Sequence, residues 1–372
     1  MLRSVADAKG LVRQTAKPAK NSIDGFTADF KRLGIVFKPD QRAVDREGII
    51  NPASARLRDG SLRLYPRMIA RGNISRIGLF RAHEHNRGAL IVDQCGYALK
   101  PTAPYELRDE SDGYGCEDPR ITYIPVIDRF VLAYVAFGPR GPEVAVAVSR
   151  DGRAWKRLGL VRFQNSTASF ADKDAAFFPE PIISPSGVPS LALYHRPTLW
   201  SLWRKHGKAA VQIIKRSRKA HEHISIAYIS LAAVRKDLRK LCEVRETHPL
   251  RLPTAGWGRI KVGGGTPPVR IREGWLSVIH GVDECQEHRG QNHLRYSAGI
   301  IILHAARLDQ VIYRSPTPLF VPELPGEIRG KVGHVVFPTA IDPRPDLGDR
   351  TFDIYYGMGD SRTGRGRLTL NQ

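Results

Sequence analysis

Short β-like segments recur in pairs along this chain, and their recurrence constrains the fold more than any other feature. Five pairs begin at intervals of roughly 60 to 85 residues, each split by a turn or a longer polar stretch. They are 62–68 with 75–81, 130–137 with 144–149, 190–194 with 224–229, 275–282 with 296–303, and 352–357 with 367–370. Helical patterns are confined to 232–241 and 22–33. Antiparallel blades around a central channel satisfy this arrangement, so the sequence predicts an all-β, five-bladed β-propeller.

The predicted propeller occupies residues 30–372 as one domain. Residues 1–29 are expected to form an N-terminal extension that packs outside the propeller or is mobile. A β-sandwich or two small β domains remain the alternatives, although the regular spacing favours the propeller.

Composition excludes several classes of protein. Hydrophobic residues make up 42% of the chain, enough for a sizeable core, yet no segment approaches the roughly 20 apolar residues that cross a bilayer. Residues 1–20 lack the apolar run of a secretory signal. The four cysteines show no spacing for zinc or redox chemistry, so we expect reduced thiols, a cytoplasmic location, no membrane, and no metal or organic cofactor.

The net charge of +21 raises the question of a polyanionic partner. The positive charge is spread along the chain, with one dense patch formed by Arg204, Lys205, Lys208, Lys215, Arg216, Arg218 and Lys219. No RNA-recognition signature, helix-turn-helix pattern or zinc-finger spacing accompanies it. We therefore interpret residues 204–223 as a solvated basic insertion and disfavour nucleic acid as the partner. A small anion such as phosphate also fits a positive potential.

The segment Cys116-Glu117-Asp118-Pro119-Arg120-Ile121 is the most informative motif for chemistry. Pro119 keeps Asp118 out of helical geometry, which indicates a carboxyl presented on a stiff turn at the entrance of a strand. Arg120 would favour the ionised form, whereas partial burial would raise the pKa of Asp118. A proton-donating carboxyl needs such opposed influences. An Asp–Arg pair that only staples a turn is the structural alternative.

Cationic side chains cluster further along the chain. Lys173 precedes Asp174-Ala175, and His195-Arg196 follows a β-like run. With Arg67 from the first strand pair, these groups could gather a phosphate dianion, because arginine forks match phosphate oxygens and lysine adds a point charge. Each could instead serve as an ordinary surface or strand-end residue.

Six motifs occur in one order between about Asn51 and Asp360. They are the Glu117–Ile121 segment, Lys173-Asp174-Ala175-Ala176-Phe177-Phe178-Pro179, Tyr194-His195-Arg196-Pro197, Gly263-Gly264-Gly265-Thr266-Pro267-Pro268, Gly274-Trp275-Leu276 with His280-Gly281-Val282, and Val335-Val336-Phe337-Pro338-Thr339 with Tyr355-Tyr356-Gly357-Met358-Gly359-Asp360. This set resembles glycoside hydrolase family 130, the inverting β-mannoside phosphorylases and their hydrolase relatives. The resemblance implies the same five-bladed propeller.

The resemblance also implies roles for single residues. Asp118 matches the catalytic acid, which acts through a substrate hydroxyl. Lys173, His195, Arg196 and Arg67 would bind phosphate, and Asn51, His280 and Asp360 would contact the sugar. The implied reaction cleaves a β-mannosyl oligosaccharide with inorganic phosphate as co-substrate, giving α-mannose 1-phosphate and an acceptor sugar. The sequence leaves open a homo-oligomer. Ala340, Ile279 and the 204–223 insertion depart from the family pattern, which leaves the acceptor sugar undetermined.

Two rival functions remain at this stage. A hydrolase of the same fold would need a second carboxylate opposite Asp118, for which Glu180 and Glu273 are the candidates. A non-catalytic basic propeller that binds a polyanion would carry exposed aromatic side chains near the basic patch, and Trp200 and Trp203 are the hint of this.

Overall fold

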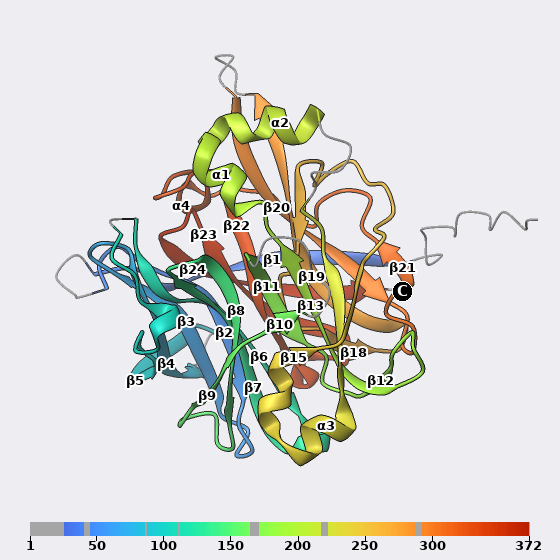
Figure 1. Ribbon diagram of the computed structural model, residues 1–372. Coiled ribbons are helices and arrows are strands. Elements are labelled where there is room, and N and C mark those ends of the chain that lie inside the picture. Colours follow the sequence, from blue (N-terminus) through green and yellow to red (C-terminus); the bar gives the residue numbers. More distant parts are fainter. Residues whose placement is uncertain are drawn as a thin grey trace, which may run out of the picture.

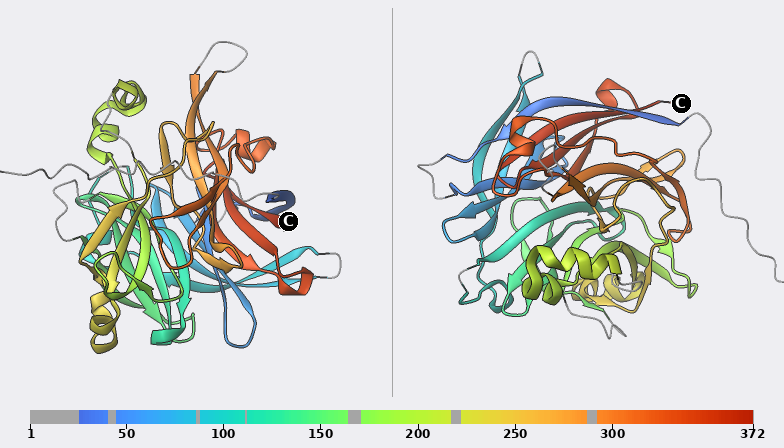
Figure 2. Two further views of the ribbon diagram at one scale, coloured as in Figure 1. Left: turned by 90° about the vertical axis from the view of Figure 1, so that its right-hand side faces the viewer. Right: turned by 90° about the horizontal axis from the view of Figure 1, so that it is seen from above.

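The computed structural model describes residues 26–40, 45–85, 88–110, 112–163, 171–216, 222–286 and 292–371. It is a five-bladed β-propeller, as the strand pairs predict (Figure 1). Viewed from above, the chain runs in order around the molecule from blue through green and orange to red (Figure 2, right). No helix among the described residues is long and apolar enough to cross a membrane.

The first two blades share one sheet, joined by a short parallel contact between their strands β4 and β6. Blade 1 contains β2 (Gly48–Arg56), β3 (Leu62–Ala70), β4 (Ile74–Glu84) and β5 (Leu90–Leu99). Blade 2 contains β6 (Tyr114–Ile124), β7 (Arg129–Gly138), β8 (Gly141–Ser149) and β9 (Lys156–Leu160).

Blades 3 and 4 each form a separate sheet. Blade 3 contains β11 (Asp172–Phe177), β12 (Ile182–Ile183), β13 (Pro189–Pro197), β14 (Ser225–Ser230) and β16 (Glu246–Pro249). Blade 4 contains β17 (Lys261–Gly263), β18 (Val269–Ile271), β19 (Gly274–Gln286), β20 (Asn292–Leu303) and β21 (Val311–Arg314). A small parallel pair, β10 (Arg162–Phe163) with β15 (Glu243–Val244), completes this side.

The fifth blade closes the ring with strands from both ends of the described chain. It contains β22 (Val336–Pro343), β23 (Thr351–Met358) and β24 (Arg362–Asn371), and β1 (Thr27–Phe37) pairs with β24 as its outermost strand. Figure 2 shows blue β1 beside red β24. The expected helix at 22–33 is therefore wrong where it is described. The blade begins at Thr27, just before the predicted boundary at 30, and residues 1–25 lie outside the described part.

Helical segments are short and lie between strands. They are η1 (Pro104–Glu106), η2 (Pro125–Ile127), α1 (Trp200–His206), η3 (Gly207–Ala209), α2 (Ala210–Arg216), α3 (Leu231–Lys236), η4 (Leu238–Cys242), α4 (Pro325–Ile328) and η5 (Pro345–Leu347). The helix expected at 232–241 is divided into α3 and η4, because Asp237 is extended and its side chain caps η4 through the backbone N–H of Arg239.

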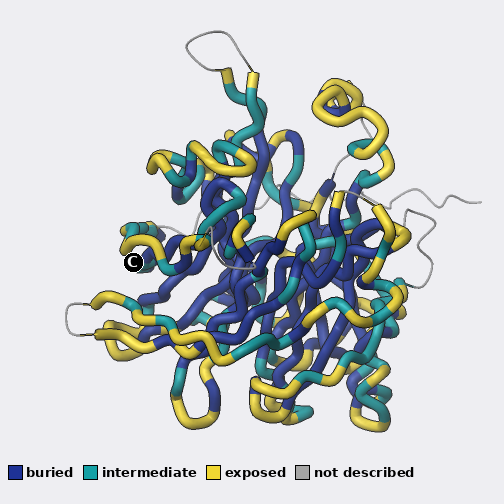
Figure 3. Tube along the Cα trace, turned by 90° about the vertical axis from the view of Figure 1, so that its left-hand side faces the viewer, coloured by how far each residue is buried: buried dark blue, intermediate teal, exposed yellow. Residues whose placement is uncertain are grey.

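All five predicted pairs are the second and third strands of successive blades. The core confirms the same division, since five apolar clusters of described residues each lie between two adjacent blades, the last between blades 5 and 1. Figure 3 shows these buried segments running through the body, with exposed positions at the loops. Each blade is therefore stabilised by apolar contacts with both of its neighbouring blades.

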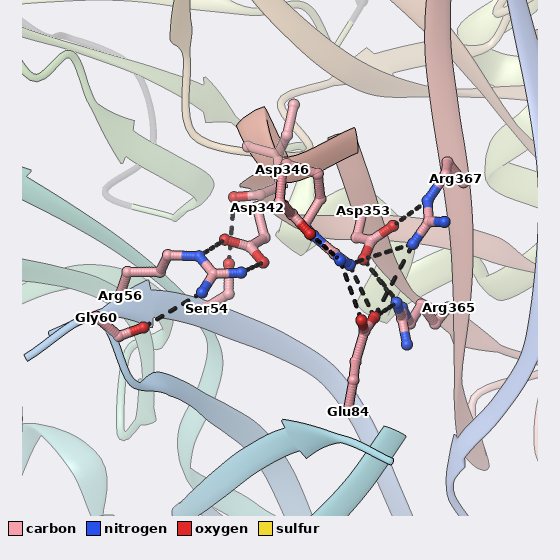
Figure 4. Close-up of polar contacts among 11 residues, drawn as sticks. Ser54, Arg56, Gly60, Glu84, Asp342, Asp346, Asp353, Arg365 and Arg367 are labelled. Carbon is pink, nitrogen blue, oxygen red and sulfur yellow. Dashed lines mark hydrogen bonds and ion pairs between the residues drawn. The ribbon is translucent and has the colours of Figure 1, made fainter. Parts of the chain in front are cut away.

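A charged network reinforces the junction between blades 5 and 1 (Figure 4). Asp353 is buried and accepts hydrogen bonds from Arg344 at 2.6 Å, Arg365 at 2.8 Å and Arg367 at 2.9 Å. Glu84 from β4 binds Arg344 and Arg365, which links blade 1 to this cluster. Burial alone would raise the pKa of Asp353, but the three guanidinium groups outweigh it and lower the pKa.

Replacing Asp353 with alanine should destabilise the protein by about 3–5 kcal/mol, because it removes the buried anion that Arg344, Arg365 and Arg367 all bind. Asp346→Ala is the matched control: Asp346 also binds Arg344, but it is exposed, so its loss should cost less than about 1 kcal/mol. Denaturant unfolding at neutral pH measures both. Equal losses in the two variants would show that the network does not hold the ring closed.

Candidate active site

Polar residues reach the channel through irregularities in the inner strands. Asn51 in β2, Asp118 in β6 and Asp174 in β11 have φ angles of 45°, 44° and 59°. The regular pairing of each strand is interrupted at these residues. A bulge of this kind turns a side chain out of the pleat, and asparagine and aspartate tolerate the left-handed conformation better than most residues. Asp118 thus lies on a bulge within β6, not at the entrance of a strand as predicted.

These residues meet in a pocket of about 260 Å³ to which all five blades contribute. Its lining comprises Asn51, Arg67, Asp118, Lys173, Asp174, Arg196, Thr198, Trp200, Trp203, Lys261, His280, Tyr296, Val332, Val335, Phe337 and Asp360. Seven of the eight residues predicted for the site are among them. Among the described residues there is no group of three or more histidine, cysteine, aspartate or glutamate side chains arranged to hold a metal.

His195 is the exception, and its placement does not agree with the predicted role in phosphate binding. Successive side chains of β13 point to opposite faces, so Arg196 faces the pocket while His195 faces away from it. His195 is buried, with Nδ1 2.6 Å from Asp172 Oδ2 and Nε2 2.9 Å from Thr247 Oγ1. Asp172 also accepts the backbone N–H of Arg196 at 3.1 Å. His195 therefore supports the strand behind the site.

Asp118 sits in a strongly cationic environment. Asn51 donates to its Oδ1 at 2.8 Å and Arg67 donates to the same atom at 3.3 Å. Burial alone would raise the pKa of Asp118, but Arg67, Arg120 and Lys173, together with the Asn51 hydrogen bond, outweigh it and lower the pKa. The predicted opposition of burial and charge is present, and the effect of charge on the pKa of Asp118 prevails.

Arg120 itself has a structural task. Its Nη1 donates to the carbonyl oxygen of Asp118 at 2.7 Å, and its Nε donates to that of Gly265 at 2.7 Å. The side chain thereby connects the bulge in blade 2 to the glycine-rich turn of blade 4. The stapling alternative considered for the Asp–Arg pair is correct for Arg120, while Asp118 still faces the pocket.

Asp360 differs from the other carboxylates of the pocket. It follows β23 at a φ of 50°, and burial raises its pKa to about 6, with Arg67 opposing and Asp118 reinforcing the shift. Two carboxyl groups with separated proton affinities thus line one pocket. Such a pair is typical of sites that hold and move protons.

Arg196 is fixed on the opposite side by two buried acids. Its Nε donates to Asp174 at 2.6 Å, and its Nη1 donates to Glu222. Despite burial, the two acids raise the pKa of Arg196, so it stays charged. His280 lies beside this pair, 3.7 Å from Asp174, and burial lowers its pKa to about 3. It is neutral at physiological pH.

The hydrogen bonds of His280 define what it can offer a ligand. Its Nδ1 lies 3.1 Å from the carbonyl oxygen of Gly264, so Nδ1 carries the proton and donates it. Its Nε2 is buried and has no hydrogen-bond partner among the described residues. A hydroxyl group that entered the pocket could donate to this nitrogen.

Sequence reasoning missed several residues of the lining. Asp174, Lys261, Tyr296 and Phe337 were not predicted for the site, although all four lie within or next to segments singled out in the sequence. Asp174 and Phe337 lie inside motifs, Lys261 just before the glycine-rich run, and Tyr296 at the start of the predicted strand 296–303. Lys261 lies 5.0 Å from the ring centres of both Trp203 and Tyr296. Its position beside two aromatic faces depends on long-range pairing that no local pattern shows.

The family model for glycoside hydrolase family 130, described as β-1,4-mannooligosaccharide phosphorylase, matches residues 27–372. This chain belongs to that family.

Named relatives agree with this membership. The chain is 28% identical over 291 residues to β-1,2-mannobiose phosphorylase from Thermoanaerobacter sp., covering 74% of this chain and 76% of the relative. It is 34% identical over 252 residues to β-1,4-mannooligosaccharide phosphorylase from Ruminococcus albus, covering 67% and 61%.

The fold is also that of solved members. One solved structure aligns with this chain at a TM-score of 0.66 and 18% sequence identity. The alignment covers 94% of this chain and 96% of the chain in that structure. The description of that structure states that this family of mannoside phosphorylases contains glycoside hydrolases that target β-1,2-mannosidic linkages in Candida mannan. At this identity the likeness shows the fold and does not choose between the two reactions.

Asp360→Asn should stabilise the protein more at pH 7.5 than at pH 4.5. The folded-state pKa of about 6 lies above the ordinary value of 3.8, so the stability that Asp360 contributes is present below about pH 4 and is lost as the pH rises through 6. The ionised form costs on the order of 3 kcal/mol at pH 7.5, which the neutral amide avoids. Thermal melting at both pH values measures this. A gain that does not depend on pH would contradict the assignment.

Proposed function

We propose that this protein is an inverting β-mannoside phosphorylase that transfers a mannosyl group to inorganic phosphate and releases an acceptor sugar. One observation carries the proposal: Asp118 shares a small pocket with four cations, Arg67, Lys173, Arg196 and Lys261. The phosphorylases named among its relatives support the same reaction class. A phosphate dianion needs convergent cations, whereas a hydrolase of neutral sugars has no comparable need.

The cations are held in place by acids behind them. Arg196 forms ion pairs with Asp174 and Glu222. Lys173 lies 3.8 Å from Glu117, and Glu117 also accepts a hydrogen bond of 2.7 Å from Arg67. Groups fixed in this way lose little conformational freedom when a ligand arrives. We assign phosphate to these cations, and the sugar to Asn51, Asp118 and Asp360 in the same pocket.

Asp118 supplies the proton in this mechanism. The surrounding cations favour the ionised form of Asp118, and a bound phosphate dianion would offset their charge and raise its proton affinity. Protonated Asp118 gives its proton to a hydroxyl of the mannosyl unit, and that hydroxyl passes its own proton to the glycosidic oxygen. A phosphate oxygen bonds to the anomeric carbon from the opposite face while the acceptor leaves, which yields the α-phosphate.

A hydrolase is the second candidate. The glutamates named for it do not support it: Glu180 is exposed and Glu273 binds Arg350 at 2.9 Å, and neither lines the pocket. Asp360 is the carboxyl that could act as a base for water, since it lies in the same pocket as Asp118. This observation keeps hydrolysis as a measurable alternative.

We also propose that the protein acts in the cytoplasm, without a metal or organic cofactor and without a nucleic-acid partner. The four cysteines, which are unpaired in the structure, are compatible with a reducing compartment. Trp200 and Trp203 of α1, just before the basic segment, line the pocket, whereas the described residues of the segment itself do not, which favours a sugar-binding over a polyanion-binding role. A homo-oligomer remains open.

Asp118→Asn should reduce turnover by about 10²- to 10⁴-fold in both directions, because a general acid typically contributes that much. Asparagine tolerates the left-handed backbone at this position, so the fold should persist. Steady-state kinetics, with saccharide binding as the control for folding, measures the change. Near-normal turnover would reduce Asp118 to a structural residue.

Lys173→Ala should raise the phosphate KM about 10- to 100-fold, the value of one or two charge-assisted hydrogen bonds, with a much smaller effect on the saccharide KM. His195→Gln is the comparison, because sequence alone predicts the same role for His195 while the structure places it outside the pocket. We expect its phosphate KM to stay within about threefold of wild type. A larger effect of His195→Gln than of Lys173→Ala would contradict this assignment.

A further inference from the structure

The helix that leads into the basic insertion lines the pocket with two tryptophans. We call residues 200–216, which form α1, η3 and α2, the helical arm. The arm stands above the strand ends in Figure 1, near the upper parts of β19 and β20. Its two tryptophans, Trp200 and Trp203, are partly exposed and line the pocket. The charged residues of the arm that the structure describes, such as Lys205 and Lys208, are exposed and do not line it.

Trp203 is anchored to the phosphate side of the site. Its indole N–H donates to Glu222 Oε1 at 2.7 Å, and Glu222 also binds Arg196. The same carboxylate oxygen accepts from Thr198 Oγ1 and from the backbone N–H of Leu199, both at 2.9 Å. The base of the arm is therefore fixed relative to Arg196.

Trp200 is held by blade 2. Its ring lies perpendicular to Phe137, with ring centres 5.2 Å apart. A Cβ at Gly141, which has a φ of 91°, would lie 2.6 Å from Trp200 Nε1, so glycine makes room for the indole there.

Ion pairs tether both α-helices of the arm. Arg204 binds Glu110 at 2.9 Å, and Lys215 binds Glu284 in β19. The arm thus extends from the loop before blade 2 to blade 4, and its two indoles are held at the pocket.

We infer that the helical arm forms the acceptor subsite, in which Trp200 and Trp203 pack against the apolar face of the neutral sugar that leaves. This inference rests on the proposed phosphorylase function and assigns the part of the substrate that the arm recognises. The charged inner half of the pocket suits phosphate and one mannosyl unit, and a volume of about 260 Å³ is small beside the roughly 300–1,000 Å³ of typical ligand pockets.

The next sugar must then lie against the aromatic boundary of the pocket. Pyranose rings present C–H groups on one face, and rigid indoles provide large contact area at low entropic cost. The arm's described charges are exposed or paired with acids outside the pocket, and none of them lines it, which favours a neutral acceptor over a charged one.

The test measures acceptor kinetics in the synthetic direction, with mannose and β-mannobiose as acceptors at saturating α-mannose 1-phosphate. Trp200→Ala and Trp203→Leu should each raise the acceptor KM about tenfold, while the KM for α-mannose 1-phosphate changes less than about threefold. Trp203→Phe keeps an aromatic face but removes the N–H donor to Glu222. It should stay close to wild type in acceptor KM. Lys208→Ala, an exposed change on the same arm, is the control.

A second readout does not require turnover. Mannose titrated into the wild-type protein should change its tryptophan fluorescence, and the change should be lost in Trp200→Ala and Trp203→Leu.

Several results would overturn the inference. If the protein performs phosphorolysis but Trp200→Ala and Trp203→Leu leave the acceptor KM unchanged, the acceptor subsite is refuted and the proposed function stands. Equal losses in Trp203→Phe and Trp203→Leu, with a raised phosphate KM, would show that Trp203 acts through Glu222 and Arg196. Saccharide-dependent fluorescence without phosphorolysis would keep the subsite and refute the proposed function.

Discussion

Each of the first three inner strands breaks its regular pairing where it meets the channel, and the site depends on this constraint. The breaks place Asn51, Asp118 and Asp174 in left-handed conformations that most side chains disfavour. A regular strand would direct alternate side chains into the sheet interfaces, where the apolar clusters lie. The bulges instead deliver polar groups to one pocket without disturbing those clusters. Local strain is tolerated because the neighbouring blades over-determine the backbone.

Electrostatic balance follows from that convergence. Four cations and several carboxylates are brought into a pocket of about 260 Å³. Each strongly buried charge has an opposite partner: Arg196 has Asp174 and Glu222, and Arg67 has Glu117 and Asp118. Asp360 is left with the least compensation, and its pKa is raised to about 6. In the proposed mechanism, a bound phosphate dianion would offset the positive charge around Asp118 and so raise its proton affinity.

Sequence predicted the parts of this molecule that local pattern controls. Hydrophobic alternation indicated the five strand pairs and the propeller. The ordered motifs led to eight predicted site residues, of which seven line one pocket. The position of β1 was missed, since its pairing partner β24 is more than 300 residues away. His195 was assigned to the wrong face, because a motif gives adjacency but not the phase of a strand. Lys261 and Tyr296 were missed because no local pattern shows that strand pairing over long range brings them to the pocket.

The identity of the product tests the central claim most directly. A β-mannosyl disaccharide would be incubated with the protein with and without inorganic phosphate, and the anomeric products would be followed by proton and phosphorus NMR. The account predicts α-mannose 1-phosphate as the initial product, formed only when phosphate is present. Free mannose released at the same rate without phosphate would contradict it, and would identify the protein as a hydrolase of the same family.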